Sequence, residues 1–296
     1  MNSIFLIGAS GFVGTNFLKY LSNEINVVKY NRGELFQLNQ NSVIHLAGKA
    51  HDLKNISSPD EYYKVNTDLT IDIFDAFLKS NSKVFITLSS VKAVADRVNG
   101  ELTEEVLPHP ITHYGKSKLL AEQYILSKLI PKGKRVYILR PCMIHGPGNK
   151  GNLNLLYSLV SKGFPWPLGL FENSRSYLSI ENLCFIIKEL IEREDIPSGV
   201  YNIADDVPLS TNEVVKMIAE SNGRKARILN LSSSLINVIA RVGDILKLPI
   251  NSERLQKLTE SYIVSNAKIK EVLGKPLPVS SKDGLMRTFK SFADNV

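Results

Sequence analysis

A tyrosine and a lysine four residues apart, Tyr114 and Lys118, are the residues of this sequence best suited to acid–base chemistry. A helical pattern over residues 113–129 carries both, and residues i and i+4 share one helix face. A tyrosine with its ordinary pKa of about 10 is a poor base at neutral pH. A lysine ammonium beside it favours the phenolate, so the pair predicts proton exchange with an alcohol or a carbonyl group.

Two serines, Ser89 and Ser90, follow an apolar run over residues 84–88 that is typical of a buried strand. A hydroxyl at a strand end can hydrogen-bond to the oxygen of a reacting alcohol or carbonyl group. The pattern Tyr-x-x-x-Lys is common by itself, and it gains weight from these serines and from the glycine turn described next. We therefore predict that Ser90, Tyr114 and Lys118 form the catalytic group.

The segment Gly8–Gly14 has the spacing G-x-x-G-x-x-G between a first apolar run and an amphipathic helical pattern. Such a turn lets the backbone approach a pyrophosphate and points the amides at a helix N-terminus toward the anion. A dinucleotide site is therefore predicted, and its nicotinamide ring would add a second positive charge near Tyr114. The residues assigned to this part of the site are Gly8, Ser10, Gly11, Phe12, Val13 and Gly14.

The second apolar run ends in Tyr30, Asn31 and Arg32, with no acidic residue at its end. Enzymes that bind the ribose 2′-hydroxyl of NAD usually have an acid at this place, whereas a guanidinium suits the 2′-phosphate of NADP. We assign Asn31 and Arg32 to the cofactor site. The sequence favours NADP, but it leaves NAD open, because Arg32 could be an exposed loop residue.

Apolar runs at residues 4–7, 27–30, 43–47, 84–88 and 136–139 alternate with helical patterns at about 60–80 and 113–129. This alternation predicts an α/β fold with a Rossmann-type, doubly wound parallel sheet. After Pro141 the chain becomes rich in glycine, proline and short helical patterns. We expect a cofactor domain of residues 1–145 plus about 177–203. Residues of about 146–176 and 204–296 would form a smaller, mixed α/β substrate domain.

Composition excludes several classes of protein. The 296 residues are 44% hydrophobic and 22% charged, which is ordinary for a globular chain. No apolar run reaches the ~18–20 residues of a membrane span, and residues 235–250 instead predict an amphipathic helix. The net charge of +7 is scattered, so it does not predict nucleic-acid binding. The two cysteines and five histidines form no metal-ligand spacing. The amino end matches a first strand rather than a signal peptide, and we expect a cytoplasmic protein.

The chain resembles the extended short-chain dehydrogenases/reductases of the nucleotide-sugar epimerase/dehydratase family along nearly its whole length. The resemblance rests on the glycine turn, His45–Gly48, Tyr63–Asn66, Leu88–Lys92, Tyr114–Lys118, Leu139–Pro141, Gly146–Gly148, Arg175–Tyr177, Tyr201–Ile203 and Lys270–Gly274. Three stretches are similar to a branch that acts on UDP-N-acetylhexosamine-type sugars in bacterial surface-polysaccharide synthesis. They are Ser89–Lys92, Gly148–Leu153 and Pro165–Asn182. This branch contains 4-epimerases and 4-keto reductases.

The resemblance implies roles for individual residues. Tyr114 would be the acid/base, Lys118 would orient the nicotinamide ribose, and Ser90 would bind the C4 oxygen of the sugar. Further cofactor contacts would come from Leu46, Ala47, Gly48, Asn66, Leu88, Ser89 and Pro141. Substrate contacts would come from Met143, Asn152, Leu153 and Arg175, of which Asn152, Leu153 and Arg175 match the nucleotide diphosphate site. Asn66 could equally be structural, and Arg175 could form a surface salt bridge.

Three places depart from the family pattern. Val94 and Ala95 stand where a Tyr-Gly or Asn-Gly pair is frequent, so a contact to the substrate would be lost. Met143 stands where an asparagine is frequent. Only residues 31–42 separate the second and third strands, so the usual helix there would be missing and the adenine more exposed.

Hydride transfer at C4 of a nucleotide sugar, with proton exchange through Tyr114, is the function that these residues and the resemblance predict. A 4-epimerase, which regenerates NAD(P) in place, and a 4-keto reductase, which consumes NADPH, both stay open. A 4,6-dehydratase is a weaker alternative, since Val91 and Lys92 follow Ser90 where such enzymes carry an acid pair. A non-catalytic NAD(P)-sensing regulator is the alternative from another class. The resemblance also implies a homodimer and a UDP-linked substrate. The scattered charge and the short apolar runs predict no nucleic-acid or membrane partner.

Overall fold

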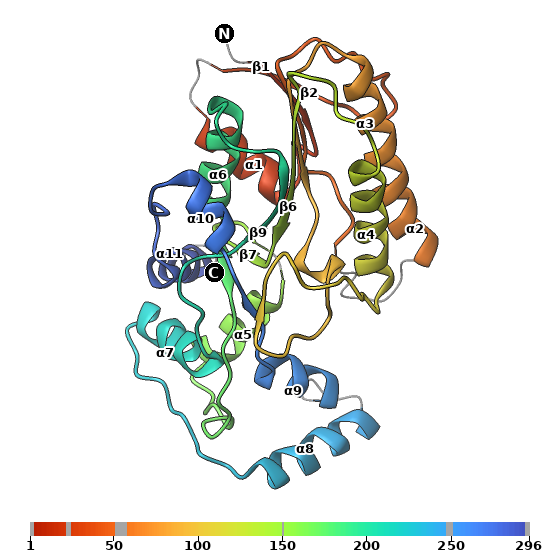
Figure 1. The fold of residues 1–296 in the computed structure, drawn as a ribbon. Coiled ribbons are helices and arrows are strands. Elements are labelled where there is room, and N and C mark those ends of the chain that lie inside the picture. The colour runs from red at the N-terminus through yellow and green to blue at the C-terminus, as the bar shows by residue number, and fades with distance from the viewer. Residues whose placement is uncertain (1–2, 22–24, 51–57, 150, 247–250, 294–296) are drawn as a thin grey trace.

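A parallel sheet of six strands forms the centre of the computed structural model, which describes residues 3–21, 25–50, 58–149, 151–246 and 251–293 (Figure 1). The strands lie in the order β2-β1-β3-β4-β6-β9. Their bounds are β1 Ser3–Ile7, β2 Asn26–Lys29, β3 Ser42–His45, β4 Val84–Leu88, β6 Arg135–Pro141 and β9 Gly199–Ile203. The buried apolar runs of the sequence thus became neighbouring parallel strands, as predicted.

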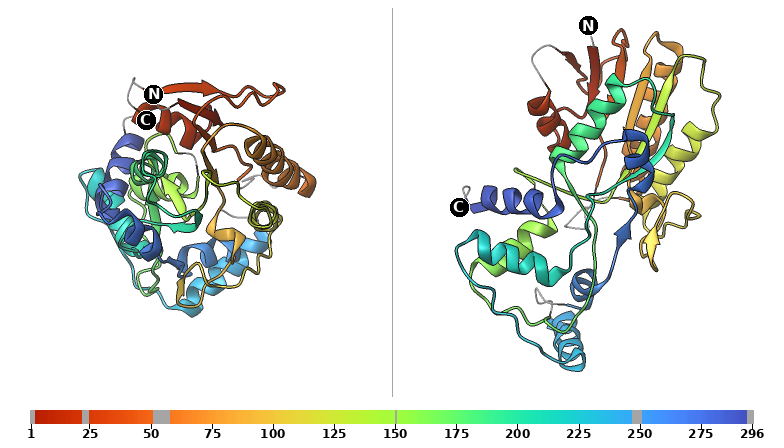
Figure 2. Two further views of the ribbon diagram at one scale, coloured as in Figure 1. Left: turned by 45° about the horizontal axis from the view of Figure 1, so that its top comes forward. Right: turned by 60° about the vertical axis from the view of Figure 1, so that its left-hand side comes forward.

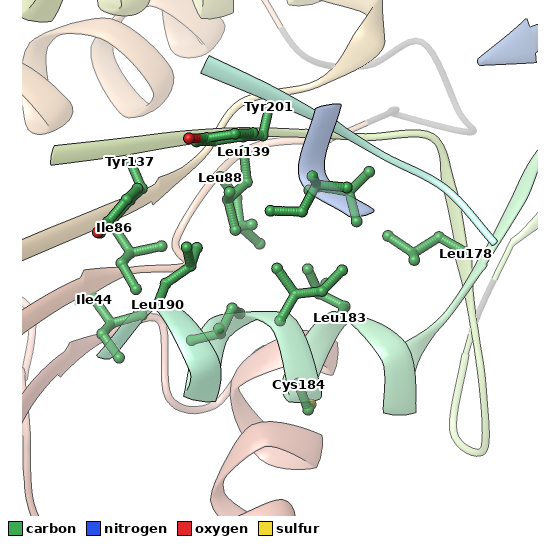
Figure 3. Packing of buried hydrophobic residues seen from close by; sticks show 14 of the residues in the cluster. Ile44, Ile86, Leu88, Tyr137, Leu139, Leu178, Leu183, Cys184, Leu190 and Tyr201 are labelled. Carbon is green, nitrogen blue, oxygen red and sulfur yellow. The ribbon is translucent and has the colours of Figure 1, made fainter. Parts of the chain in front are cut away.

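Helices cover both faces of this sheet. One face packs against α1 (Phe12–Tyr20), α6 (Ile180–Glu192) and α10 (Ala267–Leu273). Figure 3 shows Leu183 and Leu190 of α6 lying against side chains of β3, β4 and β6. The other face packs against α3 (Leu69–Lys79) and α4 (His113–Leu126). The fold is therefore the doubly wound, Rossmann-type α/β fold that the alternation of patterns predicted.

The direction of winding reverses between β1 and β3. The chain passes from β1 to β2 at one edge, then crosses back to β3 on the other side of β1. Residues 30–41, all of which the structure describes, form turns and loops rather than a helix, as expected. Ligands of such sheets bind beyond the carboxyl ends of the strands at the point of reversal. That point lies next to Gly8 and Leu46, which directly follow β1 and β3.

Most of the later chain packs around a second core below the sheet (Figure 2). Its helices are α5 (Asn152–Ser161), α7 (Thr211–Ser221), α8 (Ser233–Leu246), α9 (Ser252–Thr259) and α11 (Ser281–Ala293). Two small sheets accompany this part: β7 (Met143–His145) pairs with β8 (Tyr177–Ser179), and β5 (Glu101–Leu102) pairs with β10 (Ile263–Val264). Tyr262, Val264 and α10 pack against the first core instead, so the end of the chain contacts both parts.

The helical patterns of the sequence are largely matched by the structure. The pattern over about 60–80 becomes α2 (Pro59–Tyr63), a single π turn η1 (Lys64–Asp68) and α3. The expected amphipathic helix of residues 235–250 is α8, which ends at Leu246, and residues 247–250 lie outside the described chain. Among the residues that the structure describes, no helix is long and apolar enough to cross a membrane.

Candidate active site

The glycine turn after β1 brings backbone atoms closer together than side chains would allow. Gly8 has a φ of +87°, and a Cβ there would lie 2.5 Å from the amide nitrogen of Ala47. A Cβ on Gly14 would lie 2.2 Å from the carbonyl oxygen of Gly8. Helix α1 starts after Gly11, and no side chain among the described residues caps it. The turn therefore fits a dinucleotide pyrophosphate, because the first amides of α1 are left for an anion.

Ser90 and Tyr114 meet at the carboxyl edge of the sheet. Ser90 follows β4, and its Oγ accepts a hydrogen bond of 3.2 Å from the amide of Lys92 at the start of η2 (Val91–Ala93). Helix α4 begins after Thr112, whose Oγ1 accepts the Gly115 amide at 3.2 Å. A Cβ on Gly115 would lie 2.3 Å from the Lys92 carbonyl oxygen, so glycine lets α4 approach η2 closely. The Tyr114 side chain is then hydrogen-bonded to that of Ser90.

Lys118 lies one turn further along α4 and is buried. Its Nζ donates to the Leu88 carbonyl oxygen at 2.8 Å. Burial lowers the pKa of Lys118 to about 8, although the nearby Glu122 raises it. Burial also raises the pKa of Tyr114, which the hydrogen bond with Ser90 lowers and the neighbouring Tyr62 raises. Burial thus disfavours the charged form of both side chains, and Tyr114 needs positive charge near it to act as a base.

Asn66 holds the loop that follows β3. Its Oδ1 accepts from the Lys49 amide at 2.8 Å, and its Nδ2 donates to the Lys49 carbonyl at 3.0 Å and to Ser117 Oγ at 3.0 Å. A Cβ on the adjacent Gly48 would lie 2.9 Å from Lys118 Nζ and 3.3 Å from Asn66 Oδ1. Gly48 thus lies close to Lys118, while Leu46 and Ala47 lie close to Gly8. The π turn η1 carries Asn66, which contacts the end of this loop. These contacts give Asn66 a structural role in addition to any cofactor contact.

At the end of β2 the structure brings together an amide, a cation and an acid. The Tyr30 amide donates to Leu6 at 2.9 Å, which places Asn31 and the exposed Arg32 beside the end of β1. Glu34, which the sequence analysis did not assign, accepts the Asn31 side-chain amide at 3.0 Å and its backbone amide at 3.3 Å. The turn at Arg32 and Gly33 brings Glu34 back to Asn31 at the end of β2. The sequence alone does not show that an acid three residues after Asn31 returns to this place.

Three predicted cofactor residues lie at the carboxyl ends of β4 and β6: Leu88, Ser89 and Pro141. The Leu88 carbonyl holds Lys118, and Pro141 ends β6 with its side chain buried. Ser89 points away from Ser90, as alternate residues of an extended chain do, and its Oγ donates to Glu122. Only the main chain of Ser89 is left for a cofactor contact.

The predicted substrate residues lie on the second part of the molecule. Met143 begins β7, and the Leu153 side chain is buried in the second core, which leaves its main chain for a ligand. Asn152 begins α5, but its side chain lies outside the described part of the structure. Arg175 pairs through its backbone with Leu209, and its guanidinium donates to the Lys257 carbonyl.

Lys92, to which the sequence alone assigned no role, is a second cation near Arg175. Its Nζ donates to the Asp96 carbonyl at 2.7 Å and lies 4.3 Å from the centre of the Tyr262 ring. Burial lowers the pKa of Lys92, Asp96 and Glu260 raise it, and Arg175 and Lys257 lower it further. Arg175 and Lys257 therefore lie near Lys92, together with the carboxylates of Asp96 and Glu260. The guanidinium of Arg175 and the ammonium of Lys92 could bind an anionic ligand.

The Val94–Ala95 pair is built into the protein interior. Val94 is buried, and the Tyr262 hydroxyl donates to the Ala95 carbonyl at 2.7 Å. The Ala95 carbonyl thus holds the Tyr262 hydroxyl, and the Tyr262 ring lies beside the Lys92 ammonium.

Comparison with known proteins places this site in a family. The model of the "NAD dependent epimerase/dehydratase family" matches residues 4–204. A UDP-glucose 4-epimerase of Vibrio cholerae is 30% identical over 98% of this chain and 95% of its own length. An N-acetyl-α-D-glucosaminyl-diphospho-ditrans,octacis-undecaprenol 4-epimerase of Escherichia coli O157:H7 is 27% identical over the same shares of both chains.

Solved structures share the fold from end to end. The structure of RMD from Pseudomonas aeruginosa with NADPH has a TM-score of 0.76, 20% identity and full coverage of both chains. The UDP-glucuronic acid 4-epimerase of Bacillus cereus with NAD has a TM-score of 0.75, 18% identity and 99% coverage of both chains. With the matched family model and the Vibrio relative, these findings show that the chain belongs to the NAD dependent epimerase/dehydratase family and is an NAD(P)-dependent enzyme.

Proposed function

We propose that this enzyme transfers hydride at C4 of a hexose carried on a diphosphate, with UDP as the carrier, and that it acts as a 4-epimerase. The observation that carries the proposal is the group of Ser90, Tyr114 and Lys118 at the end of β4. When bound, the nicotinamide would accept the hydride from C4 and return it. The glycine turn, Leu46–Gly48 and the end of β2 would hold the dinucleotide.

The proton at the C4 oxygen is the part of the reaction that the chain itself controls. Ser90 would hold the C4 oxygen, and Tyr114 would take its proton when the alcohol becomes a ketone and return it when the ketone is reduced. The Lys118 ammonium would stabilise the phenolate during this exchange. A dehydratase would need an acid beside Ser90, whereas Val91 is apolar and Lys92 is held by Asp96 and Tyr262.

The cations on the substrate side support a diphosphate ligand. The two epimerase relatives named above act on hexoses whose carriers differ, uridine in one and undecaprenol in the other, but both carriers are joined through a diphosphate. Arg175 and Lys92 would bind these phosphates, together with the amides at the start of α5. We also propose the division of labour expected from the sequence, with residues 1–145 and about 177–203 binding the dinucleotide and the remainder binding the sugar.

A 4-keto reductase is the second candidate, and Arg32 is the observation that favours it. A reductase consumes NADPH and must exchange it, whereas an epimerase restores its cofactor and can retain it. Acid release of dinucleotide from freshly purified enzyme, read by mass spectrometry, separates the two. We expect bound NAD, and C4 inversion of UDP-glucose or UDP-N-acetylglucosamine by NMR. Enzyme free of dinucleotide that oxidises NADPH with a 4-keto sugar would establish the reductase instead.

Replacing Arg32 tests the preference between the two cofactors. In Arg32→Gln, loss of the guanidinium should weaken NADPH binding by about tenfold and leave NADH binding nearly unchanged, because only NADPH carries the 2′-phosphate. Fluorescence titration measures both dissociation constants. Glu34→Gln is the matched variant, and it should improve NADPH binding by removing the acid beside that phosphate. If Arg32→Gln weakened the binding of NADPH and NADH equally, Arg32 would not bind the 2′-phosphate.

We further propose a cytoplasmic homodimer. Leu120 and Leu126 of α4 leave 44% and 60% of their surface exposed, which gives this helix apolar side chains for a second copy to cover. Both cysteines are free thiols, which suits a reducing compartment. Light scattering should give about twice the 33.0 kDa of one chain.

A further inference from the structure

Glu122 is a buried carboxylate that the proposed chemistry leaves without a role. It lies one helical turn beyond Lys118 and two beyond Tyr114, so all three share one face of α4. Arg140 of β6 donates to it from Nε at 3.0 and 3.1 Å and from Nη2 at 2.6 Å. Ser89 Oγ donates to the same carboxylate. The side chains of Glu122 and Arg140 are 2% and 6% exposed, so this pair is screened from water.

Three consecutive residues at the end of β4 therefore meet three successive turns of α4. Ser90 bonds to Tyr114, the Leu88 carbonyl accepts from Lys118, and Ser89 donates to Glu122. The last of these contacts is anchored to a third element, because Arg140 belongs to β6. A change at Glu122 thus alters how α4 lies along the strand end, and with it the positions of Tyr114 and Lys118.

Glu122 and Lys118 line the same small pocket beside α4. Asn66, Thr70 and Thr87 also line it, and it has room for about one water molecule. Because Glu122 and Lys118 are both buried, little solvent screens their charges from each other. Glu122 accordingly raises the pKa of Lys118 and opposes the effect of burial.

We propose that Glu122 is a positioning residue for Lys118: held by Arg140 and Ser89, it fixes α4 against the end of β4 and keeps the Lys118 ammonium charged. This inference rests on the proposed function, in which a charged Lys118 favours the Tyr114 phenolate. The ionisable groups around Lys118 are Tyr114 and Glu122 on α4, His45 on β3 and, behind Glu122, Arg140 on β6. Burial, and then the charge of Lys118, lower the pKa of His45 to about 3, so His45 stays neutral where the enzyme works.

The variant Glu122→Gln removes the negative charge and keeps the shape of the side chain. The pH at which Lys118 loses its proton should then fall by on the order of one unit, because the charge that opposes burial is gone. Competitive acetylation with acetic anhydride, followed by peptide mass spectrometry, measures that midpoint without cofactor or substrate. Lys116, exposed on the same helix, is the internal reference. In turnover, the high-pH limb of kcat should move down by the same amount, with KM little changed.

A double variant separates two effects of Glu122: its influence on the pKa of Lys118 and its neutralisation of the Arg140 charge. Glu122→Gln alone leaves a buried guanidinium without its counter-charge, whereas Glu122→Gln/Arg140→Gln removes both charges and should recover thermal stability. The Lys118 midpoint should stay low in the double variant. Glu189→Gln, which removes another buried carboxylate on α6, should leave it unchanged.

The inference would be overturned if Lys118 lost its proton at the same pH as in the wild type, either in Glu122→Gln or in the double variant. That result would not touch the proposed function, because the labelling needs no turnover. The proposed function has its own test in the substrate assay and in Tyr114→Phe.

Discussion

Tyr114→Phe should lose about 10³-fold in kcat while NAD(P) binding stays nearly unchanged. The substitution removes only the hydroxyl, so the ring still packs edge-on against Tyr62, whose ring centre lies 6.3 Å away. Without the hydroxyl, no group at this position can take the proton from the C4 oxygen. Stopped assays of C4 inversion and fluorescence titration of the cofactor measure the two effects separately.

Tyr124→Phe is the matched control for that loss. Tyr124 lies on the same helix, and its hydroxyl donates to Asp75 at 2.9 Å on the face that packs against α3. This variant loses a hydroxyl and a hydrogen bond without touching the site, so it should retain activity. If Tyr114→Phe kept the activity of Tyr124→Phe, proton exchange would belong to another group and the proposed chemistry would be wrong.

The parts of the molecule that the sequence predicted well depend on local pattern. The buried runs became strands of one parallel sheet. Gly8 lies where the backbone passes close to Ala47, and Gly14 lies where α1 passes close to the Gly8 carbonyl. Family membership, the doubly wound fold and NAD(P)-dependent nucleotide-sugar chemistry are confirmed by the comparisons. The fold and the dinucleotide turn follow from spacing and periodicity, which a single sequence displays directly. The family and the nucleotide-sugar substrate were expected from the resemblance to known proteins.

What the sequence could not predict depends on contacts between distant segments. The ring that lies beside the Lys92 ammonium belongs to Tyr262, and the cation that pairs with Glu122 of α4 is Arg140 of β6. No local pattern indicates either contact, because each joins residues that are far apart in the chain and meet only in the folded structure. Ser89 shows the same limit: its neighbour Ser90 faces Tyr114, but the extended backbone turns Ser89 toward Glu122.

Gly8→Ala should abolish tight cofactor binding, with a loss on the order of 100-fold. The added Cβ would lie 2.5 Å from the Ala47 nitrogen and 2.8 Å from the Leu46 carbonyl carbon, and both are backbone atoms that cannot rotate away. Either the turn or the loop after β3 must then move, and both are proposed to hold the dinucleotide. The φ of +87° adds strain of about 1 kcal/mol to the folded state.

Gly133→Ala separates the two contributions, because Gly133 has a φ of +84° but nothing within 4 Å of an added Cβ. This control should lower the free energy of unfolding through backbone strain alone and leave cofactor binding unchanged. Urea unfolding and titration with NADH and NADPH on both variants make the comparison. If Gly8→Ala bound cofactor as well as Gly133→Ala, the close approach of β1 and β3 would serve packing only. The dinucleotide would then have to lie elsewhere along the carboxyl edge.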